Sequence, residues 1–268
     1  MEDSDPSTTF SKTENSKNHR FPISLPIAET IENVHACSYL PNLSANLPLK
    51  LPGRILTPEE FDSVLASGIR RSGIFLYHTD CATCNACEPS RIKVEHFVVR
   101  NSFRRVLNKG NRELEMRVQL PILDQQHVEL FNLHRSQRGL GEADQEYHPT
   151  DYENFLVDTC CPHTLELNFW HREELVGVSI IDCGKNSLSA VYTFFSPQYS
   201  KLSIGTYSIL KQIEFAAQSE REYVYLGLYV EQNQHLNYKA RFTPQERYIE
   251  GKWVNFPDPS KGTNSGGF

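Results

Sequence analysis

Three cysteines lie two residues apart in the segment Cys81-Ala-Thr-Cys84-Asn-Ala-Cys87, and Cys37 precedes them in the same predicted module. At this spacing a tight turn brings the sulfurs close enough for their thiolates to bind one ion, and a closed site takes four ligands. We therefore predict a metal site made of Cys37, Cys81, Cys84 and Cys87. The spacing leaves zinc and an iron–sulfur cluster both open. It also leaves open a loop whose cysteines bind nothing or form a redox pair.

A second candidate site is the expected strand-to-helix junction at 195–206, which places Ser203, Gly205 and Thr206 near a helix N-terminus. Free amide groups and the helix dipole favour a phosphate or a developing oxyanion at such a position. The plainer alternative is that Ser203 only caps the helix.

Two cations flanked by aromatic residues follow the next expected strand, in Tyr238-Lys239-Ala240-Arg241-Phe242. The side chains of Tyr238, Lys239 and Arg241 could hold a carboxylate or a phosphate. The alternative is a charged surface with buried aromatic rings.

A basic stretch stands out against the net charge of −6, because residues 91–112 carry seven positive side chains and one acidic one. Arginine side chains suit phosphate oxygens, and phosphate contacts dominate affinity for nucleic acid. The stretch therefore favours nucleic-acid binding, and a solvated face with scattered ion pairs is the alternative. The candidate contacts are Arg100, Arg104, Arg105 and Lys109.

The elements that must position these residues form one unit at 188–242. Residues 187–195 and 223–230 are rich in β-branched and aromatic residues, and the apolar spacing from Ile204 to Phe215 indicates a helix between them. A β–α–β unit of this length pairs its strands in parallel. Ligands bind at the carboxyl ends of such strands, so 195–206 and 229–241 are expected to line one cleft.

The remaining patterns divide the chain. We predict a disordered leader at 1–28, a small α+β module with the cysteines at 29–107, and a linker at 108–119. An α/β domain at 120–256 and a disordered tail at 257–268 follow. Thr57-Pro58-Glu59-Glu60 is a strong helix start. Cys160 and Cys161 are expected to be core residues.

The bulk composition is that of a soluble globular protein, with 39% apolar and 22% charged residues. No apolar run is long enough to span a membrane and no signal peptide is visible, so we predict a cytoplasmic monomer. Seven cysteines then indicate thiols or metal ligands rather than a disulfide framework. No hydrolase, zinc-protease or dinucleotide-binding motif occurs.

Taken together, several segments resemble those of the aminoacyl-tRNA–protein transferases. This family includes the short bacterial aspartate/glutamate leucyltransferases and their longer arginyltransferase relatives. The resemblance covers roughly 30–256, and its strength lies in the order and spacing of the segments. They are Cys37-Ser-Tyr-Leu-Pro, Gly68-Ile-Arg-Arg-Ser-Gly73, Tyr77-x3-Cys81-x2-Cys84-x2-Cys87-x-Pro89, Ser189-Ala-Val-Tyr-Thr-Phe-Phe-Ser-Pro197, Ile204-Gly-Thr-Tyr207, Tyr225-Leu-Gly227 and Tyr238-Lys-Ala-Arg-Phe242.

The resemblance implies transfer of leucine or arginine from its tRNA to the α-amine of proteins that begin with Asp or Glu, which marks them for N-end rule degradation. It also implies an N-acetyltransferase-like C-terminal fold and, in some relatives, an iron–sulfur cluster at the N-terminal cysteines. The transfer itself needs no cofactor. Leucine is favoured as the donor because the chain is short and has the cysteine triplet.

Within that chemistry, Tyr192, Tyr229 and Ser203 are the candidates for assisting the proton or the oxyanion. Gly205, Thr206, Tyr238, Lys239 and Arg241 are the candidate substrate-binding residues, and the basic stretch would bind tRNA. Two rival functions remain: a non-catalytic, metal-bearing RNA-binding module, and an N-acetyltransferase that uses acetyl-coenzyme A. The second would need a more glycine-rich turn than Leu202-Ser-Ile-Gly-Thr206.

Overall fold

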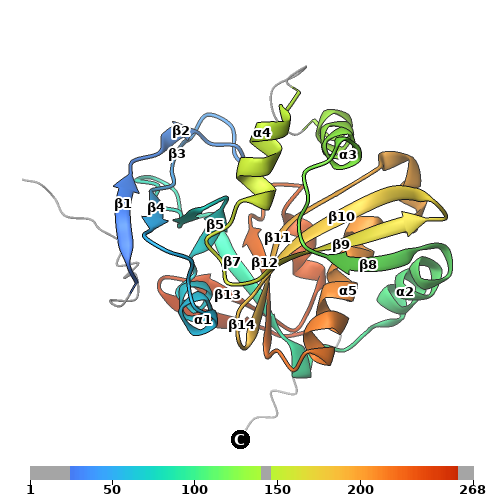
Figure 1. Ribbon diagram of the computed structural model, residues 1–268. Coiled ribbons are helices and arrows are strands. Elements are labelled where there is room, and N and C mark those ends of the chain that lie inside the picture. The colour runs from blue at the N-terminus through green and yellow to red at the C-terminus, as the bar shows by residue number, and fades with distance from the viewer. Residues whose placement is uncertain (1–24, 140–145, 259–268) are drawn as a thin grey trace, which may run out of the picture.

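The computed structural model describes residues 25–139 and 146–258, and its main feature is a mixed eight-stranded sheet (Figure 1). The strand order is β14-β13-β7-β12-β11-β10-β9-β8. These strands are β7 (Glu88–Lys93), β8 (Glu115–Gln119), β9 (Thr164–His171), β10 (Glu174–Cys183), β11 (Ser187–Phe195), β12 (Tyr223–Tyr229), β13 (Gln245–Ile249) and β14 (Lys252–Phe256).

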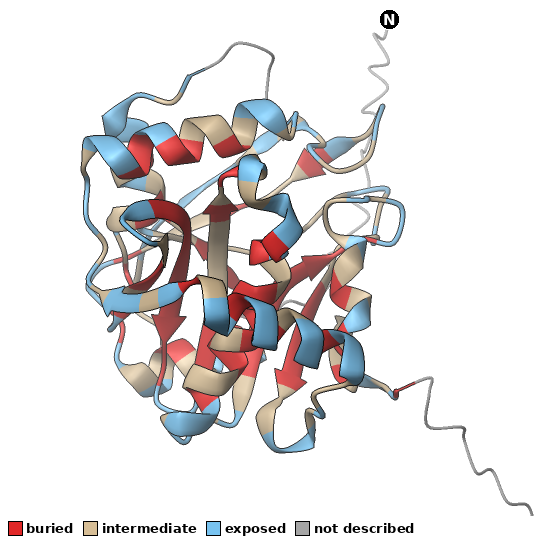
Figure 2. Ribbon diagram, turned by 90° about the vertical axis from the view of Figure 1, so that its right-hand side faces the viewer, coloured by how far each residue is buried: buried red, intermediate tan, exposed pale blue. Residues whose placement is uncertain are grey.

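Helices cover both faces of this sheet and leave its interior strands buried (Figure 2). Helices α2 (Asn101–Glu113) and α5 (Ile204–Gln218) pack on one face, around Phe169 and Tyr207. Helix α3 (Gln125–Gln137), α4 (Pro149–Tyr152) and the π-helical turn η2 (Glu153–Val157) pack on the other. The expected α/β fold with a mixed sheet and flanking helices is confirmed.

A smaller four-stranded sheet with the order β1-β4-β6-β5 lies beside the large one, at the left in Figure 1. Helix α1 (Pro58–Ala66) begins as expected, because Thr57 and Glu60 form both hydrogen bonds of a capping box. The small sheet and its hairpin comprise β1 (Ile27–Ile31), β2 (Val34–Ala36), β3 (Ser44–Asn46), β4 (Leu49–Pro52), β5 (Arg70–Ser72) and β6 (Phe75–Tyr77).

One buried ion pair joins this part to the large sheet. Arg71 of β5 donates from Nε to Asp182 of β10 at 2.6 Å, and both side chains are almost inaccessible to solvent. A further hydrogen bond from the Thr164 hydroxyl holds the same carboxylate. Breaking a buried pair of this kind leaves an uncompensated charge, which typically costs about 3–5 kcal/mol.

The structure corrects the expected division of the chain. Residues 108–119 form the end of α2 and the edge strand β8 rather than a separate linker. Strand β7, placed in the small module from the sequence, lies between β13 and β12 in the large sheet. Its partners come more than a hundred residues later, so no local pattern could assign it. Most of the expected leader and tail, 1–24 and 259–268, lies outside the described residues.

Candidate functional site

The parallel strands β11 and β12 separate part-way along their length. They pair at three positions only, Ser187 with Tyr223, Leu188 with Val224 and Ser189 with Tyr225. Close to these positions, a β-bulge interrupts the pairing of β11 with β10, and a second one interrupts the pairing of β12 with β7. Backbone groups beyond Ala190 and Leu226 are therefore freed from mutual pairing. The β–α–β unit predicted from the sequence is confirmed, and its strands diverge toward their carboxyl ends.

Arg70 of β5 lies at the point where the two strands diverge. Its Nη2 donates to the carbonyl oxygen of Ala190 on β11 at 2.7 Å. A Cβ added at Gly227 of β12 would stand 3.2–3.3 Å from three atoms of the same guanidinium. Gly227 has φ +90°, and its missing side chain leaves room for Arg70. One guanidinium thus bridges the two separated strands.

Lys239 approaches the same point from the short helix η4 (Asn237–Arg241). Its Nζ donates to the carbonyl oxygen of Leu228 on β12 at 2.8 Å, and the residue is 6% exposed. Burial, together with the nearby Arg70 guanidinium, lowers the pKa of Lys239 to about 7. Within residues 25–139 and 146–258, neither Arg70 nor Lys239 forms an ion pair with a carboxylate.

The carboxyl end of β11 meets helices α3 and α5 at Phe195. Gly205, in the first turn of α5, lies against the Phe195 ring, where an added Cβ would stand 3.2 Å from it. On the other side, His134 of α3 accepts a hydrogen bond at Nδ1 from the Phe195 amide. The Arg138 guanidinium lies 5.6 Å from the same ring and reaches His235 in the loop after β12. Arg138 of α3 thus contacts both segments that were expected to line one cleft, 195–206 through Phe195 and 229–241 through His235.

The three candidates for the proton and oxyanion roles occupy different environments. Tyr192 is half-buried among aromatic rings of α3 and η2, and burial raises its pKa. Tyr229 is buried under the Arg247 guanidinium, which lies 3.7 Å from its ring. Ser203 is exposed, has a left-handed backbone, and makes no capping hydrogen bond with its side chain. Ser203 therefore occupies the N-cap position of α5, as the simple alternative expected, but its side chain does not cap the helix.

Arg241 is separated from Lys239 although the two are near neighbours in sequence. It is exposed and its guanidinium lies 5.9 Å from the ring of Phe103 on α2. Its carbonyl oxygen accepts a hydrogen bond from Arg100, which also forms an ion pair with Asp258 at 3.4 Å. Arg241 thus lies on the basic side of the molecule, and Arg100 is partly engaged within the fold.

The other basic residues lie on the outer face of α2. This helix buries Phe103, Leu107 and Gly110 against the core, so its remaining face points to solvent. Arg104 and Arg105 are exposed there and form no ion pair with the residues described. Lys109 is also exposed and donates to the carbonyl oxygen of Lys201.

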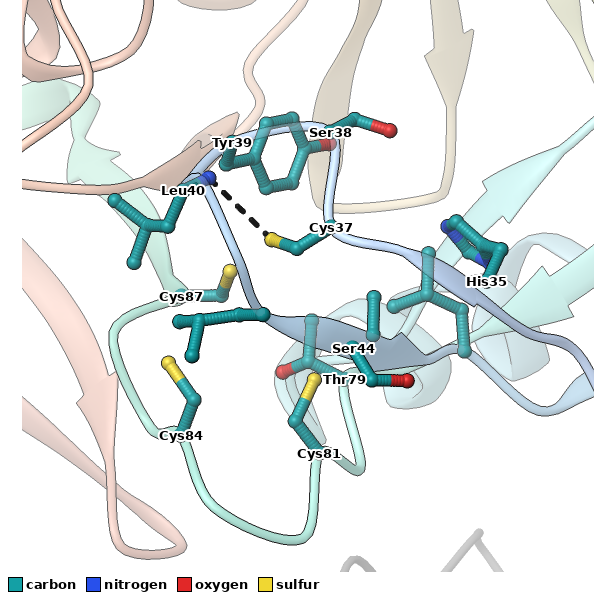
Figure 3. A pocket seen from close by; sticks show the side chains of 13 residues that line it. His35, Cys37, Ser38, Tyr39, Leu40, Ser44, Thr79, Cys81, Cys84 and Cys87 are labelled. Carbon is teal, nitrogen blue, oxygen red and sulfur yellow. Dashed lines mark hydrogen bonds between the residues drawn. The ribbon is translucent and has the colours of Figure 1, made fainter.

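All four predicted cysteine ligands line a single pocket (Figure 3). Cys37 follows β2, whereas Cys81, Cys84 and Cys87 belong to the loop between β6 and β7. Burial, with the other three sulfurs nearby, raises the pKa of Cys87 to about 12. No three His, Cys, Asp or Glu side chains of the described ranges are arranged to hold a metal ion, so the structure brings the ligands together without forming the site.

The cysteine pocket adjoins the diverging strands through Tyr39. This residue lines the pocket, and burial raises its pKa, with Arg70 among the charges close to it. Its carbonyl oxygen accepts a hydrogen bond from Asn233, in the loop that follows β12. The expected core residues Cys160 and Cys161 are buried as predicted, 5% and 2% exposed.

Arg70 is the residue that sequence reasoning did not assign. It stands in the quoted segment Gly68-Ile-Arg-Arg-Ser-Gly73, between the apolar residues of α1 and those of β6. Two adjacent arginines that are both buried, Arg70 at 7% and Arg71 at 6% exposure, are unusual for a short strand. That pair of buried arginines was the signal in the sequence. Only the structure shows that Arg71 has a carboxylate partner, whereas Arg70 has none among the described residues.

Comparison with known proteins identifies the family to which the chain belongs. Residues 35–105 match the family described as Arginine-tRNA-protein transferase, N terminus, and residues 126–249 match its C terminus. The chain therefore belongs to the arginine-tRNA-protein transferase family and is an aminoacyltransferase, as the segments quoted from its sequence predicted.

More specific relatives carry the name aspartate/glutamate leucyltransferase. The protein of that name from Aeromonas hydrophila is 35% identical over 225 residues, which span 82% of this chain and 92% of the relative. The one from Acinetobacter baumannii is 37% identical over 224 residues, or 82% and 80%. The one from Saccharophagus degradans is 35% identical over 226 residues, or 83% and 94%.

Solved structures give only distant matches. A C-terminal domain described as that of a lysylphosphatidylglycerol synthetase from Agrobacterium fabrum has a TM-score of 0.46 and 12% identity, over 75% of this chain and 65% of that one. FemX has a TM-score of 0.42 and 6% identity, over 74% and 79%. Separately, no helix among the described residues is both long and apolar enough to cross a membrane.

Proposed function

We propose that this protein transfers leucine from Leu-tRNA to the N-terminal α-amine of proteins that begin with Asp or Glu. The observation that carries the proposal is the gap where β11 and β12 stop pairing, beside which lie two buried cations that have no carboxylate partner in residues 25–139 and 146–258. Such a gap suits an anionic acceptor. The names of the relatives supply the leucyl donor and the acidic acceptors.

The chemistry asks for positioning more than for a strong catalytic group. The amine nitrogen attacks the ester carbonyl, the bond to the terminal ribose oxygen of the tRNA breaks, and the amine's proton ends on that oxygen. A free α-amine has a pKa near 7.7–8.0, so a substantial fraction is already nucleophilic at neutral pH. The enzyme must therefore align the two substrates and stabilise the oxyanion.

Three groups at the diverging strands are placed to assist. We assign Tyr192 and Tyr229, which lie on the two strands just past the carbonyls of Ala190 and Leu228, to the relay of the amine's proton. The amides at the start of α5, around Gly205 and Thr206, would stabilise the oxyanion, because α5 has 15 residues and an aligned dipole. Ser203, exposed beside them, would contact the ester.

The donor's tRNA would bind along α2. Arg104, Arg105 and Lys109 present charge to solvent on that helix. Arg241 and Arg100 meet beside Phe103, so Arg241 belongs with this surface rather than with the acceptor. Tyr238, beside Lys239, would line the passage from the tRNA surface to the gap.

The cysteine pocket would serve the fold rather than the transfer. Four thiols form a donor set that suits zinc or an iron–sulfur cluster, and we propose that such a centre fixes the segment after β2 against the loop 81–87. No step of the transfer passes through it. We further propose that the protein acts in the cytoplasm as a monomer and that its products enter N-end rule degradation.

Incubation of the protein with labelled Leu-tRNA and short peptides tests the proposed function. We expect label on peptides that begin with Asp or Glu and none on peptides whose α-amine is acetylated. Label from Arg-tRNA instead would make the protein an arginyltransferase. Binding of tRNA without any transfer would favour the non-catalytic RNA-binding module, and dependence on acetyl-coenzyme A would favour the N-acetyltransferase.

A further inference from the structure

Two buried cations share one small region of the protein interior. Arg70 is 7% exposed and Lys239 is 6% exposed, and they contact adjacent residues of β12: the Arg70 guanidinium lies against Gly227, and Lys239 Nζ donates to the carbonyl oxygen of Leu228. Each makes one hydrogen bond, and both acceptors are backbone carbonyl oxygens on the strands that diverge. Nζ of Lys239 has two further protons, and the guanidinium of Arg70 has four further N–H groups.

Buried charges in folded proteins are normally paired, because transfer of an unpaired ion from water into the interior is costly. Arg71, the next residue in the chain, follows that rule through its ion pair with Asp182. Arg70 and Lys239 do not follow it within the described residues, and they repel each other as well. Two neighbouring buried cations that lack a carboxylate partner among the described residues therefore indicate a binding site for an anionic ligand.

We propose that Arg70, together with Lys239, binds the side-chain carboxylate of the acceptor's first residue and so sets the preference for acidic N-termini. This inference rests on the proposed function. A guanidinium presents two parallel N–H groups to a carboxylate, which a lysine cannot do, so Arg70 supplies the orientation and Lys239 a second charge.

The position of the pair favours a carboxylate side chain over a tRNA phosphate. Both cations are more than nine-tenths buried, so a short side chain suits them better than a bulky polynucleotide backbone does. The exposed cations suited to phosphates lie elsewhere, on α2. A carboxylate held at Arg70 also leaves the α-amine, only two or three carbons away, near the level of Tyr192 and Tyr229.

The gap itself explains why Arg70 can act this way. Ala190 and Leu228 lie beyond the last paired residues of β11 and β12, so their carbonyls are free to hold the two cations in place. Gly227 makes room for the guanidinium itself, since a Cβ there would stand 3.2 Å from Cζ of Arg70. The two cations are thus held in place by backbone atoms and do not need the ligand for their position.

The test compares wild type, Arg70→Gln and Arg70→Lys with matched peptides that begin with Asp or Asn. Initial rates give kcat/KM for both peptides, and calorimetry gives peptide Kd without tRNA. For Arg70→Gln we expect the Asp peptide to lose on the order of 10²-fold in both measurements and the Asn peptide to lose at least tenfold less. Arg70→Lys should recover part of the lost activity and affinity for the Asp peptide, because lysine restores the positive charge but not the two parallel N–H groups of the guanidinium.

The ratio between the two peptides separates recognition from a folding defect, since misfolded protein lowers both values equally. Equal losses for the Asp and Asn peptides would overturn the inference. So would an intact ratio with weaker binding of Leu-tRNA, which would assign Arg70 to a phosphate. Absence of any transfer by the wild type would refute the proposed function, whereas an unaltered ratio in an active Arg70→Gln variant would refute only the role of Arg70.

Discussion

The charge of Lys239 depends on what lies next to it. In the free protein its pKa is lowered to about 7 by burial and by Arg70, so its charged form is disfavoured near neutral pH. An unfolded lysine has a pKa near 10.4. Between these values the unfolded chain binds one more proton than the folded one. The free energy of unfolding therefore rises with pH across this window because of Lys239.

Replacement by methionine removes this dependence. We expect Lys239→Met to raise the free energy of unfolding relative to wild type, and to do so by about 2 kcal/mol more at pH 7 than at pH 9. Urea unfolding at the two pH values measures the difference. Lys201→Met, at an exposed position, is the control and should show no such difference. An equal effect of Lys239→Met at both pH values would contradict the lowered pKa.

Residue types predicted part of this site and missed part of it. Lys239 could be picked out because it follows a strand-like run and is flanked by aromatic residues. Arg70 could not, since its function depends on Ala190 and Gly227, which are more than a hundred residues away in the chain. Arg241 was paired with Lys239 from their proximity in sequence, but η4 turns the two side chains in different directions.

At the scale of elements, His134 fixes the end of β11 to helix α3. The Phe195 amide donates to its Nδ1 at 3.1 Å, and the residue is 2% exposed. Burial lowers the pKa of His134 to about 4. Since an unfolded histidine has a pKa near 6.5, the unfolded chain binds the extra proton between pH 4 and 6.5. Acid therefore destabilises this junction.

The variant His134→Asn can keep the hydrogen bond through Oδ1 but cannot titrate. We expect the free energy of unfolding of wild type to fall relative to that of the variant by about 1 kcal/mol for each pH unit from 6.5 to 4.5. Chemical unfolding of both proteins at pH 6.5, 5.5 and 4.5 supplies the measurement. His127 lies beside Glu166 and Asp124 and its pKa is raised, so its contribution runs in the opposite direction and is common to both proteins. Parallel curves would show that His134 is not the titrating group.

Elements set by local signals were predictable, and those set by distant pairing were not. The capping box of α1, the β9–β10 hairpin and the β–α–β unit each follow from spacing within a short segment. The insertion of β7 between β13 and β12 depends on partners from the far end of the chain. The separation of β11 from β12 is likewise a property of the whole sheet, and it creates the candidate site.

At the scale of the whole molecule, the net charge is negative, but the exposed face of α2 is positively charged. The net charge is −6, yet α2 presents Arg104, Arg105 and Lys109 on one side of the large sheet. The acceptor would enter a gap between strands, whereas the tRNA would lie across a helix surface. Binding of the tRNA should therefore depend strongly on salt, because each phosphate contact releases counterions.

Reversal of charge on α2 tests this division. We expect Arg104→Glu with Arg105→Glu to weaken binding of Leu-tRNA and to reduce the slope of log Kd against log salt by about 2. Binding of the Asp-initiated peptide should be unaffected, because Arg70 and Lys239 are buried elsewhere. Lys185→Glu with Lys252→Glu changes the net charge equally at exposed positions away from α2, so it separates a local contact from the overall field. If both double variants lower the slope alike, α2 is a solvated face and the tRNA binds by net charge alone.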